Sequence, residues 1–241
     1  MRTAALATVF LAALGSMGQA QNPPAAPGHV GAGLTVFGVL LAFFLVTGPR
    51  SPGVPWFERG SADAERILLG ELWRAVTALT LHADLAHAVA NALAGALFLS
   101  AVCAALGPGL GCALVLLSGA GGNLINAFVR GSGHVSVGAS TAVFGAVGLL
   151  SGLAMARGRR REARERHAWV PIGAGFAILA TLGTAGANSD HWAHLFGLLV
   201  GGALGMPLGF AVSRPPGRSI QWILGATAIA ALLYCWARAL H

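Results

Sequence analysis

The stretch that decides the fold is WAHLFGLLVGGALGMPLGFAV, residues 192–212, in which no Asp, Glu or Arg occurs. About 20 apolar residues are enough for a helix to cross the hydrocarbon core of a membrane. Glycine recurs at every fourth position, as Gly197, Gly201 and Gly205, so these glycines lie on one face of the predicted helix. The stretch therefore predicts a membrane-spanning helix that a second helix can approach closely.

Six further stretches are similarly long and apolar, and none has Asp, Glu or Arg in its interior. In chain order the seven predicted spans are 30–48, 85–106, 110–128, 139–156, 169–185, 192–212 and 220–237. Short links join them, except for a long loop over residues 49–84. We therefore expect an all-α polytopic membrane protein.

The composition of the chain agrees with this expectation. Its 241 residues are 56% hydrophobic and 10% charged, whereas a soluble globular domain is about 25% charged. So few charges cannot cover a globular surface, which excludes a cytosolic enzyme, a disordered regulator and a DNA-binding module. The formal net charge is +7, and every basic residue is Arg. Six of these arginines lie within 157–166 beside an apolar stretch, which indicates membrane topology rather than a nucleic-acid partner.

Clusters of arginine orient the predicted spans. The arginines of 157–166 lie between the fourth and fifth spans, and Arg214 and Arg218 lie between the sixth and seventh. Positive residues mark loops on the cytoplasmic side, and these two loops have the same parity along the chain. The first span therefore runs outward and the loop 49–84 faces the outside. The chain then ends outside, although Arg238 near that end does not follow the rule.

The first twenty residues offer a second orientation. Arg2, the apolar run 4–14 and the small residues before residue 21 resemble a secretory signal peptide. Cleavage after Ala20 would invert every later span and contradict the arginine loops. Two alternatives agree with those loops: the segment is not used as a signal, or translation begins at Met17.

Three groups of polar residues lie where predicted spans begin. In chain order they are His82, His87 and Asn91; Ser140; and His191 with His194. A polar side chain in lipid costs free energy unless it finds a partner, so we expect these groups to face the bundle interior. By parity all three lie near the outer face. Each residue alone is also compatible with packing or a structural hydrogen bond, but a Ser, a His and two donors at one depth favour a serine hydrolase.

Small residues predict that the fourth and sixth spans lie close together. On the fourth span, a stripe at every fourth position comprises Ser140, Phe144, Gly148 and Gly152. Small residues at this spacing let helix backbones approach closely. If this stripe faces the glycines of 197–205, Ser140 and His194 lie at the same end of a tight interface. The histidine is then within hydrogen-bond reach of the serine, as general-base activation requires.

Together these motifs, over about residues 70–205, resemble those of rhomboid intramembrane serine proteases. They are, in order, Trp73-Arg74; His82 with His87 and Asn91; Gly138-Ala139-Ser140; and Ala193-His194 with Gly197 and Gly201. The resemblance implies a rhomboid-like six-helix bundle with an additional C-terminal transmembrane helix. It divides the chain into an N-terminal apolar, signal-like and Pro-rich segment (1–29), a six-helix catalytic core (30–213) and the extra helix (214–241).

The resemblance also implies a catalytic Ser–His dyad that acts without an acid. Ser140 is the expected nucleophile. His194 is the expected base because, unlike His191, it fits the pattern Ala-His-x-x-Gly-x-x-x-Gly. His87 and Asn91, with the backbone N–H of Ser140, are the expected donors to the oxyanion, a role in which each donor typically contributes ~2.7–4 kcal/mol.

Further residues are expected to support this site. Gly138 allows close backbone approach at the serine turn, and Phe144 is expected to stack on the catalytic imidazole. His82 is expected to be structural, and Trp73 with Arg74 to belong to a loop motif on the outer leaflet. Apolar residues among charges predict an amphipathic segment in this loop; they are Trp56, Phe57, Ile67, Leu68, Leu69 and Leu72.

Two residues leave alternatives open. Thr141 stands where the family most familiarly has a glycine, and its bulk beside Ser140 is expected to narrow the substrate cleft. Asp190 fits either the acid of a triad or a loop cap, and it is left out of the expected site.

The implied reaction is hydrolysis of a peptide bond in or near a transmembrane helix of another protein, through an acyl-enzyme. The expected partners are transmembrane substrate proteins and the lipid bilayer, without nucleic acid, and the oligomeric state stays open. No cofactor or metal is expected, because the histidines are dispersed and no carboxylate accompanies them. The compact chain and its arginine-only basicity indicate the bacterial inner membrane, with the active site opening to the outer, periplasmic face.

Two alternatives remain. A rhombosortase-like peptidase would process the C-terminal anchors of exported proteins. A non-proteolytic rhomboid-like protein would bind membrane helices without cutting them, although such relatives usually lack the Ser or the His and both are present here. A transporter is disfavoured, because the sequence shows no midplane charge and no pair of broken helices.

Overall fold

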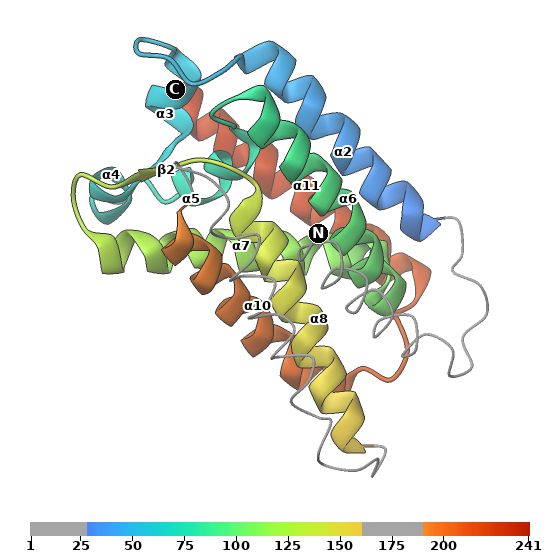
Figure 1. The fold of residues 1–241 in the computed structure, drawn as a ribbon. Helices are drawn as coiled ribbons and strands as arrows, with labels where there is room; N and C mark the ends of the chain where they lie inside the picture. The colour runs from blue at the N-terminus through green and yellow to red at the C-terminus, as the bar shows by residue number, and fades with distance from the viewer. Residues whose placement is uncertain (1–27, 161–189) are drawn as a thin grey trace, which may run out of the picture.

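Long apolar stretches form the main helices, and the computed structural model describes residues 28–160 and 190–241. Six helices in these residues are long and apolar enough to cross a membrane. They are α2 (Gly28–Thr47), α6 (Leu85–Leu106), α7 (Pro108–Arg130), α8 (Ser140–Arg160), α10 (His191–Ala211) and α11 (Arg218–Leu240) (Figure 1). Each coincides with a predicted span, so the all-α polytopic fold is confirmed. The predicted span 169–185, the signal-like segment 1–20 and the arginines after Arg160 lie outside the described residues.

Local capping signals set the ends of the helices that carry the predicted site. The side chain of Asp84 accepts a 2.8 Å hydrogen bond from the backbone N–H of His87 at the start of α6. Asp190 does the same for Ala193 at the start of α10, at 3.1 Å. Such side chains satisfy backbone N–H groups that have no partner inside the helix. Gly107, with φ of 86°, allows the sharp turn between α6 and α7.

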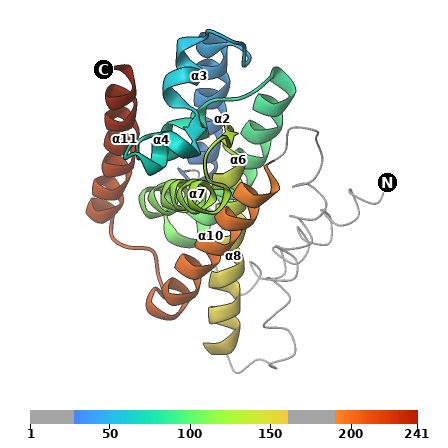
Figure 2. The same ribbon diagram turned by 90° about the vertical axis from the view of Figure 1, so that its left-hand side faces the viewer.

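The long helices alternate in direction. Helices α6, α8 and α10 begin at the end of the bundle where α2, α7 and α11 finish (Figure 1). Helix α8 is central, since 72% of its most apolar window is buried, against 11% for α11, which lies at the edge of the bundle (Figure 2). Arg157 near the end of α8 and Arg218 at the start of α11 therefore lie at the end opposite to Ser140.

The loop 49–84 is folded into short elements. These are α3 (Pro55–Gly60), β1 (Ala62–Asp63), α4 (Ala64–Leu68), α5 (Arg74–Thr77) and the 3-10 turn η1 (Ala78–Thr80). Strand β1 pairs antiparallel with β2 (Val135–Ser136), which precedes α8. The sequence did not predict this two-stranded sheet, which ties the loop to the connection that leads to Ser140.

The predicted amphipathic segment of this loop has a buried side and an exposed side. Phe57 and Ile67 are buried, whereas Leu68, Leu69 and Leu72 are exposed. Apolar side chains exposed beside charged residues are what a segment at a membrane surface presents to lipid.

Helices α8 and α10 are in backbone contact, as the glycine stripes predict. A Cβ atom added to Gly197, Gly201 or Gly205 would collide with a backbone carbonyl oxygen of α8. The residues that supply these oxygens are Thr141, Gly145 and Leu149. This set is shifted by one residue from the stripe predicted on α8. Two glycines of the predicted stripe, Gly148 and Gly152, also meet the α10 backbone.

Replacing Gly201 by Ala tests this contact. Besides the carbonyl oxygen, the added Cβ would lie 2.8 Å from the carbonyl carbon and 3.0 Å from the Cα of Gly145. Overpacking of this kind costs about 1–3 kcal/mol, so the thermal unfolding midpoint in detergent should fall.

The matched control is Gly202→Ala on the same helix, where the nearest atom to an added Cβ is the Gly148 oxygen at 3.8 Å. Alanine favours a helix over glycine by up to about 1 kcal/mol, so this variant should be as stable as the wild type or more so. Equal unfolding midpoints for the two variants would show that α8 and α10 are not tightly packed.

Candidate active site

The structure brings Ser140 and His194 into direct contact. Ser140 begins α8 and His194 lies in the first turn of α10, and their Oγ and Nε2 atoms are 2.7 Å apart. The imidazole is buried, with 5% of the residue exposed, while Ser140 is partly exposed. A histidine whose Nε2 accepts a hydrogen bond from a serine hydroxyl is placed to remove its proton.

Two contacts within the described residues help to hold His194 beside Ser140. The ring of Phe144, one turn along α8, stacks on the imidazole with centroids 4.7 Å apart and an interplanar angle of 29°. The backbone N–H of His194 donates to the carbonyl of Asp190 at 3.1 Å. His191, the other histidine considered from the sequence, lies on an exposed position of the first turn.

The turn before Ser140 is fixed by segments distant in sequence. Gly138 has φ of 128°, a conformation that residues with a side chain rarely adopt. Its N–H donates to the carbonyl of Ala78 at 2.9 Å, and the N–H of Ala139 donates to His82 Nε2 at 3.4 Å. Ser140 therefore follows a turn in which the N–H groups of the two preceding residues are both engaged in hydrogen bonds.

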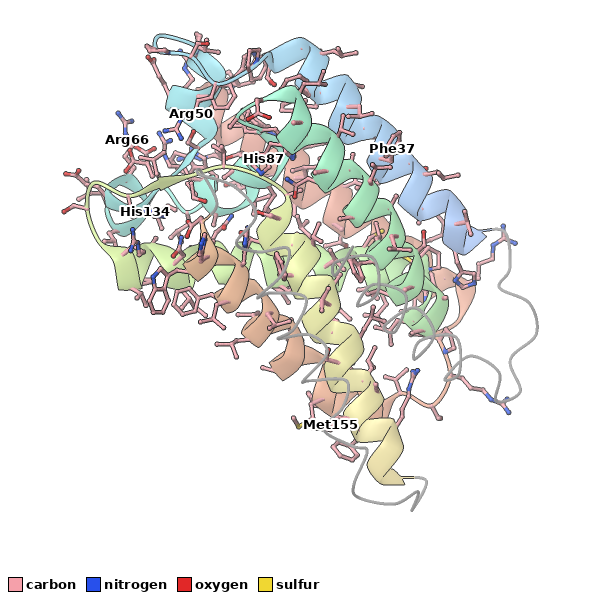
Figure 3. All side chains as sticks on the ribbon, in the orientation of Figure 1. Phe37, Arg50, Arg66, His87, His134 and Met155 are labelled. Carbon is pink, nitrogen blue, oxygen red and sulfur yellow. The ribbon has the colours of Figure 1, made fainter. Side chains whose placement is uncertain are left out.

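His87 lies against this turn. A Cβ atom on Gly138 would lie 2.7 Å from Cε1 and 2.9 Å from Nε2 of the His87 ring, so only glycine leaves room for it. The Nδ1 atom of His87 accepts from the N–H of Ala83 at 3.4 Å. In the neutral ring the proton is then on Nε2, on the side of the ring that faces Gly138. Figure 3 shows His87 next to the loop that joins β2 to α8.

Asn91 lies one turn deeper on α6 and is buried. Its Nδ2 donates to the carbonyl of His87 at 2.9 Å. An amide nitrogen carries two protons, so this bond uses one of them and the second remains available to a ligand or to the oxyanion of a reacting carbonyl.

His82 is fully buried, and its Nε2 accepts the N–H of Ala139. Its ring contacts that of His87 edge-on, with centroids 5.3 Å apart. Burial, and then the proximity of His87, lower the pKa of His82 from 6.5 to about 4. His82 is therefore neutral at physiological pH, which it must be in order to accept a hydrogen bond.

Trp73 and Arg74 lie in the loop and do not join Ser140. Arg74 is buried, and its guanidinium donates to Glu71 at 2.6 Å and to the carbonyls of Glu58 and Ser61 at 3.0 and 3.2 Å. These bonds hold α3, β1 and α5 together. Arg74 thereby supports the segment that the Gly138 N–H contacts.

The structure corrects the expectation for Thr141. Its side chain is buried rather than directed into a cleft, with 2% of the residue exposed. Its Cγ2 methyl group fills the space that Gly122 of α7 and Gly197 of α10 leave by lacking Cβ atoms. The added bulk is therefore taken up between three helices and does not narrow the access to Ser140.

A polar cluster that the expected site does not include lies at the start of α10. Asp190 Oδ2 lies 2.7 Å from both Asn126 Nδ2 and His134 Nε2, while its Oδ1 caps α10. Asn126 is a polar residue inside a predicted apolar span. The search for polar side chains within such spans, which selected His87 and Asn91, could therefore have found Asn126 as well. His134 lies in a loop and gives no such signal. Figure 3 places His134 at the same end of the molecule as His87.

This cluster favours the ionised form of the Asp190 carboxyl group. Burial opposes ionisation of its carboxyl group, but the N–H of Ala193 and the side chains of His134 and Asn126 outweigh burial and lower its pKa below the ordinary value. Within the described residues its oxygens are engaged by these three groups, so Asp190 acts as a helix cap. In the same residues no group of three or more His, Cys, Asp or Glu is arranged to hold a metal ion.

Two comparisons with known proteins cover this site. The family model of the Rhomboid domain matches residues 69–210, a range that includes Ser140, His194, His87 and Asn91. The chain is also 31% identical over 169 residues to YdcA of Bacillus subtilis (strain 168), which is named as a candidate rhomboid protease. That match spans 70% of this chain and 82% of YdcA.

Substitution of Asp190 by Ala should destabilise the protein. It removes the cap of α10 and leaves His134 and Asn126 without their shared acceptor, which costs about 1–3 kcal/mol. An asparagine at this position would still cap the helix, so Asp190→Asn is the matched control and should lose less. Thermal unfolding in detergent measures both; an equal loss for the two variants would contradict the capping role.

The low pKa of His82 predicts acid sensitivity. The unfolded chain binds a proton near pH 6.5 but the folded chain only near 4. The stability that neutral His82 contributes is therefore complete above pH 6.5 and is lost as the pH falls toward 4, by up to about 3 kcal/mol.

Unfolding free energies between pH 7.5 and 4 should show this loss in the wild type. In His82→Gln, which keeps an acceptor but does not titrate, the loss should be smaller by that amount. If the unfolding free energies of the two proteins changed in parallel with pH, His82 would be ruled out as the source of the acid sensitivity.

Proposed function

This chain belongs to the rhomboid family, and from that premise we propose that it is an intramembrane serine endopeptidase. The chain is an integral membrane protein, with six apolar helices long enough to span a bilayer in its described residues. Family membership points to a protease. The proposed substrates are membrane proteins, cut at a peptide bond in or near a transmembrane helix.

The observation that carries the proposal is the 2.7 Å contact between Ser140 Oγ and His194 Nε2. In the proposed reaction His194 removes the hydroxyl proton while Ser140 Oγ bonds to the carbonyl carbon of the substrate. The carbon–nitrogen bond then breaks, and His194 passes the proton to the leaving amine. Water attacks the resulting acyl-enzyme by the reverse proton path and restores Ser140.

The negative charge on the carbonyl oxygen needs donors that are already in place. The proposed donors are the ring N–H of His87, the second N–H of Asn91 and the backbone N–H of Ser140. Ser140 is the first residue of α8, where backbone N–H groups have no partner within the helix and the helix dipole favours negative charge. The proposed oxyanion site is therefore at the positive end of the central helix.

The proposed catalytic pair acts without a carboxylate. Phe144 stacks on the imidazole and restricts its orientation, while Asp190 is occupied as the cap of α10. This arrangement supports a Ser–His dyad rather than a triad.

The proposed location is the bacterial inner membrane, with Ser140 near the outer face. Arg157, Arg214 and Arg218 lie at the end of the bundle opposite to Ser140, and positive residues mark the cytoplasmic side. No nucleic acid is proposed as a partner.

Labelling with a fluorescent fluorophosphonate tests the proposal, because this probe reacts with an activated serine whatever the natural substrate. Detergent-purified wild type should be labelled, and Ser140→Ala and His194→Ala should lose at least about 100-fold in labelling rate, on the order of catalytic-group deletions. The control is Ser151→Ala on the same helix, whose hydroxyl donates to the carbonyl of Val147; it should label like the wild type.

Failure of the folded wild type to react would contradict the proposal and favour a membrane-helix-binding protein without protease activity. Equal labelling of Ser140→Ala would move the nucleophile to another residue and contradict it equally.

A further inference from the structure

Helix α11 contributes no residue to the proposed dyad or oxyanion site. It packs against α7, α5 and α3, and its buried residues, Trp236 and Ala239, both lie near its C-terminal end. That end is where the loop 49–84 and the start of α8 also lie (Figures 1 and 2). The two buried residues of α11 therefore lie at the level of Ser140.

We propose that Trp236 is a positioning residue for the nucleophile: it holds the segment 78–82, and this segment holds the turn that presents Ser140. The inference rests on the proposed function of Ser140, and it gives the additional C-terminal helix a role in the reaction.

The first contact is a hydrogen bond from Trp236 to the segment. The indole Nε1 donates to Thr80 Oγ1 at 3.2 Å in a buried environment. The Thr80 hydroxyl in turn donates its proton to the carbonyl of Thr77 at 2.8 Å. The hydroxyl thus accepts one bond and donates another, which fixes its orientation and that of the backbone of η1.

The indole ring is itself held in one position. It packs against Phe43 of α2 and Trp56 of α3, with ring centroids 5.3 and 5.4 Å away. A Cβ atom on Gly60 would lie 2.6 Å from its Cη2 atom, so the ring occupies space that only glycine leaves. The fully buried Leu81, next to Thr80, belongs to the same apolar cluster.

The second contact joins the segment to the nucleophile turn. The carbonyl of Ala78 accepts the N–H of Gly138 at 2.9 Å, and Nε2 of His82 accepts the N–H of Ala139 at 3.4 Å. Thr80 lies midway between these two acceptors. Trp236 therefore contacts one side of a five-residue segment whose ends bind the two residues that precede Ser140.

Further contacts keep the end of α11 beside the loop. The guanidinium of Arg238 lies over the ring of Trp73, with its Cζ 5.1 Å from the centroid, and Arg59 donates to the carbonyl of Leu240 at 2.9 Å. The cation–π contact gives Arg238 a partner. Arg238 lies at the outer end of the bundle, where the rule that positive residues mark the cytoplasmic side predicts no arginine.

Trp236 is not part of the proposed dyad or oxyanion site. Its loss should therefore change how well Ser140 is positioned and not how tightly the probe binds. Small displacements of reacting groups reduce rates strongly. The expected signature is a lower maximal rate of fluorophosphonate labelling at an unchanged half-saturating probe concentration, in protein that is still folded.

The test compares Trp236→Phe, which keeps an aromatic ring but loses the donor, with Thr80→Val, which loses the acceptor at nearly constant volume. Each should lower the maximal labelling rate about threefold to tenfold, as expected for loss of one buried hydrogen bond, and the double variant should lose no more than either alone. Thr80→Ser keeps the hydroxyl and should retain the wild-type rate. Trp222→Phe changes a lipid-exposed indole of the same helix and should have no effect.

A second measurement does not depend on catalysis. Hydrogen–deuterium exchange of the peptide that contains Gly138 and Ala139 should be faster in Trp236→Phe than in the wild type and in Trp222→Phe. Wild-type labelling rates and exchange in Trp236→Phe would overturn the positioning role and leave the proposed function intact. Absence of labelling in the folded wild type would overturn the proposed function itself.

Discussion

The backbones of α8 and α10 meet without side chains between them, because Gly197, Gly201 and Gly205 leave room for carbonyl oxygens of α8. A larger residue at any of these positions would separate the helices. The distance between Ser140 Oγ and His194 Nε2 depends on this approach, since each residue lies at the start of its helix and its side chain reaches only a short way. Because Gly122 and Gly197 also lack Cβ atoms, the methyl group of Thr141 fits into the space beside them.

Polar groups at this end of the bundle satisfy one another in two layers. The inner layer contains Ser140 and His194, and the outer layer contains capping and loop residues that engage backbone groups of the same helices. Asp190 shows the advantage of this division: it binds the start of α10 and the side chains of Asn126 and His134. The carboxylate thus stabilises the helix that carries His194 rather than binding the imidazole.

The loop 49–84 links these layers to the rest of the molecule. Arg74 fastens its short elements together, strand β1 pairs with β2 ahead of α8, and Trp236 contacts it from the far end of the chain. In a membrane, backbone outside a helix must find its hydrogen-bond partners within the protein. The loop 49–84 is therefore ordered by the same contacts that place the turn before Ser140.

Hydropathy and residue spacing by themselves determined the positions of the described spans, their alternation, and the shared end at which His87, Ser140 and His194 lie. These are local properties, because helix length and parity follow from consecutive residues. Tertiary structure alone decided the one-residue shift between the α8 and α10 stripes, the burial of Thr141 and the bond between Trp236 and Thr80. Contacts of that kind depend on the rotation of each helix about its axis and on residues up to 156 positions apart, which no local pattern encodes.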